Sequence, residues 1–107
     1  MPECCQVSTT IDSPESAAEL ARTAVEARVA ACGQVIGPID SVYRWEGRVD
    51  SAREWLVLFK TTAERADALV EHIRGLHPYD VPEVITTPVT GGNPAYLAWI
   101  GEETRPR

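Results

Sequence analysis

The 107-residue sequence lacks most features that assign a protein to a class at once. No apolar run approaches the roughly 18 residues that a membrane-spanning helix needs, so we expect no membrane partner. Met1-Pro2-Glu3 has neither the basic segment nor the apolar stretch of a signal peptide. A formal net charge of -6 argues against a nucleic-acid partner, because phosphate binding needs a basic surface.

Catalytic motifs are also missing. The sequence contains no G-x-S-x-G, no Walker-type phosphate loop, no H-E-x-x-H and no nucleophile paired with a base. We therefore expect a protein that is not an enzyme and that requires no cofactor.

Cysteine is scarce and odd in number. Of the three cysteines, Cys4 and Cys5 are adjacent and would point to opposite faces of a strand. A stable disulfide framework is not expected. Reduced thiols are typical of the cytoplasm, which is the location that we predict.

The length and ordinary composition predict one domain spanning 1–107, with a core over about 3–101 and a frayed tail at 102–107. Alternating and helical periodicities predict four strands and three helices. One strand is expected at 3–11 and another at 84–89 as a proline-limited edge strand. The other two form the hairpin at 41–61, and the first of them begins at 34–39 with a break or bulge at Gly37-Pro38.

Helix boundaries follow from capping signals. Ser13-Pro14 should begin the first helix, which should end near Cys32-Gly33 with Gly33 as C-cap. A capping box at 61–64 should begin the second helix, which Gly75 and Pro78 would stop. Asn93-Pro94 should cap a short final helix.

The hairpin at 41–61 is the stretch around which the chain is organised. Its turn is predicted at Asp50-Ser51, a short polar break between two strands. The second arm is apolar on both faces: Trp55, Val57 and Phe59 line one, and Leu56 and Leu58 line the other. A strand of this kind expects cover on both faces, and the chain has few helices to provide it. The second cover should come from another copy of the chain.

The order β-α-β-β-α-β plus a terminal helix predicts an α+β fold of the ferredoxin-like class. In that plan an antiparallel sheet carries both main helices on one face and leaves the other face open. Because the second arm of the hairpin is apolar on both faces, this open face should not be exposed to water. An oligomer follows from the residues alone.

Candidate metal ligands are Cys32, His72 and His77. The histidines lie five residues apart, which is not the i, i+4 spacing of two ligands on one helix face. A solvated helix histidine and a loop histidine bonded to backbone are the simpler interpretation of the spacing. Cys32 suits either a small buried hydrophobe or a soft ligand for Cu(I) or Zn.

Polar residues beside the apolar strands form a second candidate set. Glu54, Lys60, Tyr79 and Glu83 could line a cleft or could form ordinary salt links at a rim. The residues by themselves do not choose between the two.

Short motifs in order along the chain resemble the CutA divalent-cation tolerance family over residues 7 to 100. The matching residues are Ala30-Ala31-Cys32; Ser41, Tyr43, Trp45 and Gly47; Lys60-Thr61; His77-Pro78-Tyr79 with Pro82-Glu83; and Gly92 followed by Tyr96-Leu97, Trp99 and Ile100. Each motif is weak alone, but together at these spacings they are highly specific.

The resemblance implies a tight homotrimer similar to the PII signalling proteins, in which the long hairpins of neighbouring subunits pair along the core. It also implies a link to tolerance of copper and other divalent ions, with copper or another divalent metal ion as a ligand. Cys32 and His77 match proposed ligand positions. Thr9 and His72 fall where some copper-binding members have cysteine.

Three functions are therefore open. The first is a metal-responsive cytoplasmic trimer that binds copper through Cys32, His72 and His77. The second is a PII-like signalling or small-ligand-binding trimer with clefts between subunits. Its ligand-binding residues would be Tyr43, Trp45, Glu54, Lys60, Tyr79, Glu83 and Trp99. The third is a scaffold that docks an unidentified protein partner.

Overall fold

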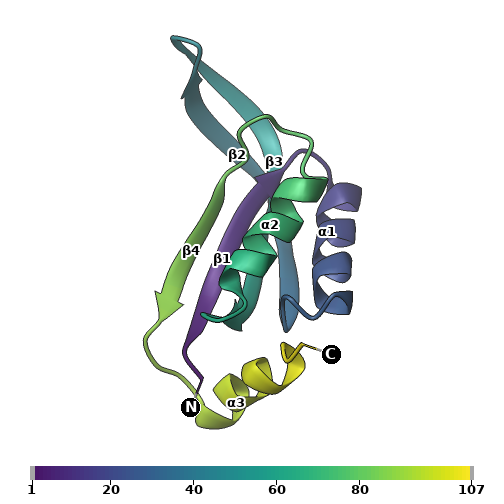
Figure 1. Cartoon of the computed structure of the whole chain (residues 1–107). Helices are drawn as coiled ribbons and strands as arrows, with labels where there is room; N and C mark the ends of the chain where they lie inside the picture. The colour runs from purple at the N-terminus through teal and green to yellow at the C-terminus, as the bar shows by residue number, and fades with distance from the viewer. Residues whose placement is uncertain (1, 107) are drawn as a thin grey trace.

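The computed structural model describes residues 2–106 and arranges them as one sheet with three helices (Figure 1). Met1 and Arg107, the ends of the predicted domain, lie outside the described residues. The elements are β1 (Cys4–Ile11), α1 (Pro14–Glu26), β2 (Cys32–Trp45), β3 (Arg48–Thr62), α2 (Ala66–Leu76), β4 (Val84–Val89) and α3 (Pro94–Glu103).

The sheet is antiparallel, with strand order β2-β3-β1-β4. Helices α1 and α2 lie side by side over one face, and α3 lies near the end of the sheet where the chain begins (Figure 1). This arrangement confirms the ferredoxin-like prediction, with β4 as an edge strand.

The core lies between the sheet and the two main helices. Val7, Val57 and Phe59 point to this side and are fully buried, together with Leu69 and Ile73 of α2. Full burial of each such side chain contributes roughly 1.5–3 kcal/mol.

Helix α1 lies very close to β2. A Cβ atom at Gly33 would come within 2.8 Å of the Ala21 Cβ, so the glycine and the alanine-rich helix face allow the close approach.

The end of α1 differs from the prediction. The helix stops at Glu26, and Arg28 adopts a left-handed φ of 61° that turns the chain back. Val29 and Ala30 continue the apolar spacing because they are buried in the core, not because they are helical. Gly33 is therefore a strand residue paired with Phe59, and the C-cap prediction is wrong.

The hairpin turn also lies elsewhere. Glu46 and Gly47 form it, with φ angles of 50° and 77°. A two-residue turn of this kind needs positive φ at both positions, which Gly47 adopts at no steric cost. Asp50 and Ser51 lie inside β3, opposite Tyr43 and Val42, so the predicted turn there is wrong. The predicted bulge at 37–38 is confirmed by the register shift between Ile36 and Ile39.

The predicted capping box is not formed. Thr61 belongs to β3, and its buried hydroxyl donates to the Val29 carbonyl at 2.7 Å. Helix α2 begins at Ala66 without a side-chain cap bond from Arg65.

The cap of α3 is confirmed, since Asn93 Oδ1 accepts from Ala95 N at 3.1 Å. Beyond α3, Thr104 is buried and donates to the Ile100 carbonyl, so packing continues past the core boundary expected at residue 101.

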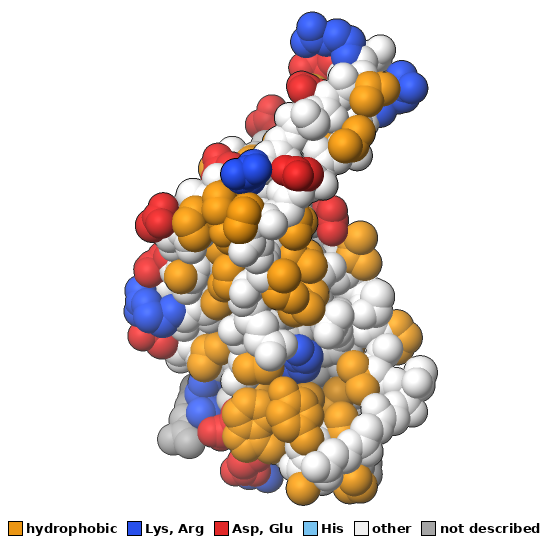
Figure 2. All heavy atoms as spheres, turned by 180° about the vertical axis from the view of Figure 1, so that it is seen from behind, with side chains coloured by type: hydrophobic (Ala, Val, Ile, Leu, Met, Phe, Trp, Pro, Cys, Tyr) orange, Lys and Arg blue, Asp and Glu red, His pale blue; other side chains and the backbone are white. Residues whose placement is uncertain are grey.

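The face of the sheet away from α1 and α2 is apolar and uncovered. Figure 2 shows hydrophobic side chains gathered on it, from the root of the hairpin down to α3. Ile36 and Ile85 are 47% and 49% exposed, and Leu56 and Leu58 are half-buried between them. We call this surface the open face. Within residues 2–106, no helix is long and apolar enough to cross a membrane.

Candidate functional site: a pocket at the root of the hairpin

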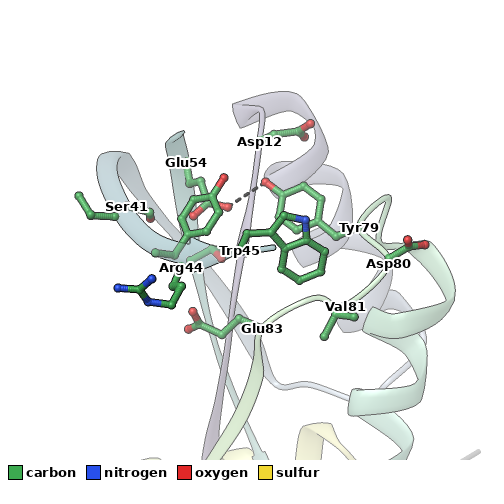
Figure 3. Close-up of a pocket in the computed structure, with 12 residues that line it drawn as sticks. Asp12, Ser41, Arg44, Trp45, Glu54, Tyr79, Asp80, Val81 and Glu83 are labelled. Atoms are coloured by element: carbon green, nitrogen blue, oxygen red, sulfur yellow. Dashed lines mark hydrogen bonds between the residues drawn. The ribbon is translucent and has the colours of Figure 1, made fainter. Parts of the chain in front are cut away.

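A pocket of about 640 Å³ lies on the open face where the hairpin leaves the body of the protein (Figure 3). It is built from the end of β1, the outer halves of β2 and β3, and the loop that joins α2 to β4. Its lining includes Tyr43, Trp45, Glu54, Tyr79 and Glu83.

Strand register explains why three of these side chains share one face. Ile39 pairs with Glu54 across the hairpin, and cross-strand partners point to the same side. Successive residues alternate, so Tyr43 and Trp45 point to the same side as Ile39. The sharp turn at 46–47 fixes this register.

Glu54 and Tyr79 form the central contact of the pocket. The Tyr79 hydroxyl donates to Glu54 Oε2 at 2.8 Å, as the dashed line in Figure 3 marks. Glu54 is only 7% exposed. Burial, and then the bond to Glu54, raise the pKa of Tyr79 well above its ordinary value. Tyr79 therefore stays a neutral hydrogen-bond donor across the physiological range.

His77 holds the loop that carries Tyr79. Its Nε2 lies 2.7 Å from the Thr10 carbonyl, and its Nδ1 accepts from the Tyr79 backbone N–H at 3.2 Å. Because a carbonyl only accepts, Nε2 carries the proton, and both ring nitrogens are used in the neutral form. The His77 and Tyr79 rings also meet edge to face, with centroids 4.6 Å apart. This is the backbone-bonded loop histidine of the simpler interpretation.

The predicted cleft residues divide into two groups. Tyr43, Trp45, Glu54, Tyr79 and Glu83 come together in the pocket. Lys60 and Trp99 lie at the far end of the sheet.

Two contacts show where Lys60 and Trp99 lie. Lys60 donates to the Gln34 side chain, and Trp99 packs against Tyr96 with ring centroids 5.4 Å apart. One chain does not bring the two groups together.

The pocket also contains charged residues that the sequence analysis did not name. Asp12, Arg44 and Asp80 line it beside the predicted residues. Arg44 lies between the predicted aromatic residues Tyr43 and Trp45, and Asp80 follows Tyr79. Their places in the sequence could therefore have indicated that they line the pocket. Asp12 offered only its place after the first strand.

The family model described as CutA1 divalent ion tolerance protein matches residues 5–103. The chain belongs to this family. The divalent-cation tolerance protein CutA of Thermus thermophilus is 42% identical over 95 residues, which cover 89% of this chain and 92% of that protein.

A plant relative and a solved plant structure are also similar to this chain over most of its length. The chloroplastic protein CutA of Arabidopsis thaliana is 42% identical over 99 residues, covering 92% of this chain and 54% of that protein. The chain thus spans about half the length of that relative. The crystal structure of CutA1 from Oryza sativa matches with a TM-score of 0.94 and 40% identity, covering 97% of this chain and 95% of that one.

The three predicted metal ligands lie in separate parts of the structure. His72 Nε2 lies 2.9 Å from the Thr23 hydroxyl, between α2 and α1. Cys32 begins β2, with its Sγ 3.6 Å from the Tyr96 hydroxyl. His77 is bonded at the opposite end of the sheet, so the three do not converge.

Among residues 2–106 no group of three or more His, Cys, Asp or Glu side chains could hold a metal ion. Within one chain, Cys32, His72 and His77 therefore do not form a shared site.

Proposed function

We propose that the protein acts in tolerance of divalent metal ions as a homotrimer in the cytoplasm, with no catalytic activity of its own. The family match supports the role in tolerance. Three cysteines without a disulfide suit a reducing compartment.

The observation that carries the trimer is the open face. Ile36 and Ile85 keep about half of their surface exposed there, with Leu56 and Leu58 between them. Soluble monomers rarely leave a contiguous apolar surface of this kind uncovered. β2 and β4 are edge strands, whose unpaired backbone groups are available to other chains. Copies of the same chain would cover both features.

Light scattering tests the assembly. We expect a native mass of three chains of 11.7 kDa each, and a lower mass when Leu58→Arg places a charge in the apolar contact. Glu71→Arg, on the outer surface of α2, is the control and should keep the assembly. A native mass of one chain for the unchanged protein would refute the proposal.

The copper-binding form of the proposal rests on Cys32, since it is half-exposed and its thiol is not enclosed in the core. His77 is unsuited as a first ligand, because both ring nitrogens are already bonded. Calorimetric titration of the reduced, metal-free protein with Cu(I), Cu(II) and Zn(II) separates the two residues. Binding should weaken in Cys32→Ser and persist in His77→Ala. Equal binding in Cys32→Ser would make the link to metal ions indirect.

A second function, a PII-like signalling or small-ligand-binding trimer, is favoured by a separate observation. The hairpin-root pocket gathers five of the seven residues predicted to bind a ligand. Aromatic walls with a few polar groups are typical of small-molecule sites. In a trimer, Lys60 and Trp99 of a neighbouring copy would be free to contribute to the same cleft.

A further inference from the structure

Two opposite charges lie at the two ends of the open face. Glu54 and Lys60 both belong to β3, and their even spacing in the strand puts their side chains on the same side of the sheet. The strand residues that share this side between them, on β1, β2, β3 and β4, are apolar or neutral polar residues such as Gln6, Ile36 and Ile85. One acid and one base therefore stand out on an otherwise uncharged surface.

Neither charge has an opposite partner in its own chain. Glu54 is 7% exposed and accepts a hydrogen bond from Tyr79, a neutral donor, through Oε2. Lys60 is half-buried and donates to the neutral side chain of Gln34. Within residues 2–106 neither residue forms an ion pair. Six residues of a strand span about 20 Å, so the two side chains of one chain are too far apart to meet.

Assembly changes the surroundings of both groups. Copies of the chain that cover the open face would enclose Glu54 and Lys60 between them, and a charge buried without a partner is costly. In a ring of three identical chains each contact joins two different patches, one from each neighbour. A contact of this kind lets the Lys60 end of one copy meet the Glu54 end of the next, and the same contact repeats around the ring.

Aromatic side chains accompany each charge. Tyr43 and Trp45 line the hairpin-root pocket with Glu54. At the other end the Tyr96 hydroxyl lies 3.6 Å from the Sγ of Cys32, the strand partner of Lys60. The three aromatic residues keep 42–48% of their surface exposed in the single chain, which a neighbouring copy would cover. Large aromatic side chains are typical anchors of protein interfaces.

We infer that Lys60 of one copy is the counter-charge of Glu54 in the next copy, so that each hairpin-root pocket is completed by a neighbouring chain. Tyr79 bonds to Oε2 and leaves Oε1 of Glu54 for the ammonium group. An ammonium group has three donors, so Lys60 can keep its bond to Gln34. This inference rests on the trimer proposed above.

Zero-length cross-linking of the unchanged full chain tests the pair directly. A carbodiimide joins an amine to a carboxylate where the two are in contact, and Lys60 is the single lysine of the sequence. We expect an amide between Lys60 of one chain and Glu54 of another, seen as covalent dimers and trimers on a denaturing gel and located by mass spectrometry. Lys60→Arg keeps the positive charge without the amine and should lose this cross-linked peptide.

Neutral variants measure the coupling between the two charges by light scattering over a dilution series. Glu54→Gln or Lys60→Gln alone should raise the concentration at which half of the chains are assembled by at least about 30-fold, because each leaves one charge buried without a partner. The double variant should assemble no more weakly than either single variant, since no unpaired charge remains. Glu71→Gln, at an exposed position on α2, is the control and should leave the assembly unchanged.

The outcomes separate the pair from the trimer. A native mass of three chains with Lys60 cross-linked to another carboxylate, such as Asp12 or Asp80, would overturn the pair and leave the trimer standing. If no cross-link forms, the neutral variants decide. Losses that multiply in the double variant would overturn the pair, and a double variant as well assembled as the single variants would support it. A native mass of one chain would refute both.

Discussion

The two faces of the sheet use the same kinds of side chain in opposite ways. Phe59 points toward the helices and is fully buried, whereas its neighbour Leu58 points to the open face and is only half-buried. Both lie in the second half of β3 and are adjacent in sequence. A single strand therefore encodes two sets of contacts, one within the chain and one that the chain cannot complete.

Truncating Phe59 and Leu58 should give the largest change in stability and directly tests the difference between the two faces of the sheet. Phe59→Ala should cost about 3–5 kcal/mol of unfolding free energy, because it leaves a cavity in the closed core. Leu58→Ala should cost less, and its cost should grow with protein concentration, because other copies of the chain supply its cover. Chemical denaturation at several protein concentrations measures both.

If the loss of unfolding free energy caused by Leu58→Ala did not depend on protein concentration, other copies of the chain would not cover the open face. The open face would then be an ordinary solvated surface. Val25→Ala, at a 39% exposed position on α1, is the control and should change stability little.

A smaller loss of stability is expected from Gly33→Ala, which tests how closely α1 packs on the covered face of the sheet. The added Cβ would meet the Ala21 Cβ at 2.8 Å, so α1 must move away from β2. Overpacking of this kind typically costs about 1–3 kcal/mol. Thermal unfolding should show the loss, and Gly75→Ala, where nothing lies within 4 Å of the added atom, should show none.

The smallest effect concerns Tyr79, which lines the pocket on the open face. Burial and Glu54 raise its folded-state pKa above the ordinary 10.0, so the unfolded chain loses this proton first. Above that pH the native state binds more protons, and the Tyr79 contribution to stability falls as pH rises. Tyr79→Phe should therefore be less stable than the unchanged protein at about pH 8, with the difference narrowing toward about pH 11.

Denaturation at the two pH values measures this difference. A difference that stays constant would mean that the Tyr79 hydroxyl ionises as it does in the unfolded chain.

The order of elements could be predicted because apolar periodicity is a local property of the sequence. The end of α1 could not, since Val29 and Ala30 keep helical spacing while serving the core from a turn. The hairpin turn was misplaced because Asp50-Ser51 looks polar and turn-like. The positive φ that such a turn requires is met at Gly47 instead.

The candidate site was predictable in part for a related reason. Tyr43, Trp45 and Glu54 follow from strand alternation, and Tyr79 from the motif that carries it. Lys60 and Trp99 lie at the other end of the sheet from these residues. Their position depends on how the strands pair in the folded structure, which the sequence pattern does not give. The bonds that use both nitrogens of His77 likewise depend on contacts distant in sequence.

The two-residue turn at 46–47 has a consequence for the route by which the chain folds. β2 and β3 are adjacent in sequence, so their pairing closes the shortest loop of the sheet. β1 pairs with β3 and β4, which lie much farther along the chain. Short loops close at lower entropic cost and faster, so the hairpin should be the first part of the sheet to form. Pulse-labelled hydrogen exchange would show its amides protected before those of β1. The nascent chain would then expose the apolar residues of the hairpin before either helix can cover them, which makes the polar tip around Gly47 a protection against premature association.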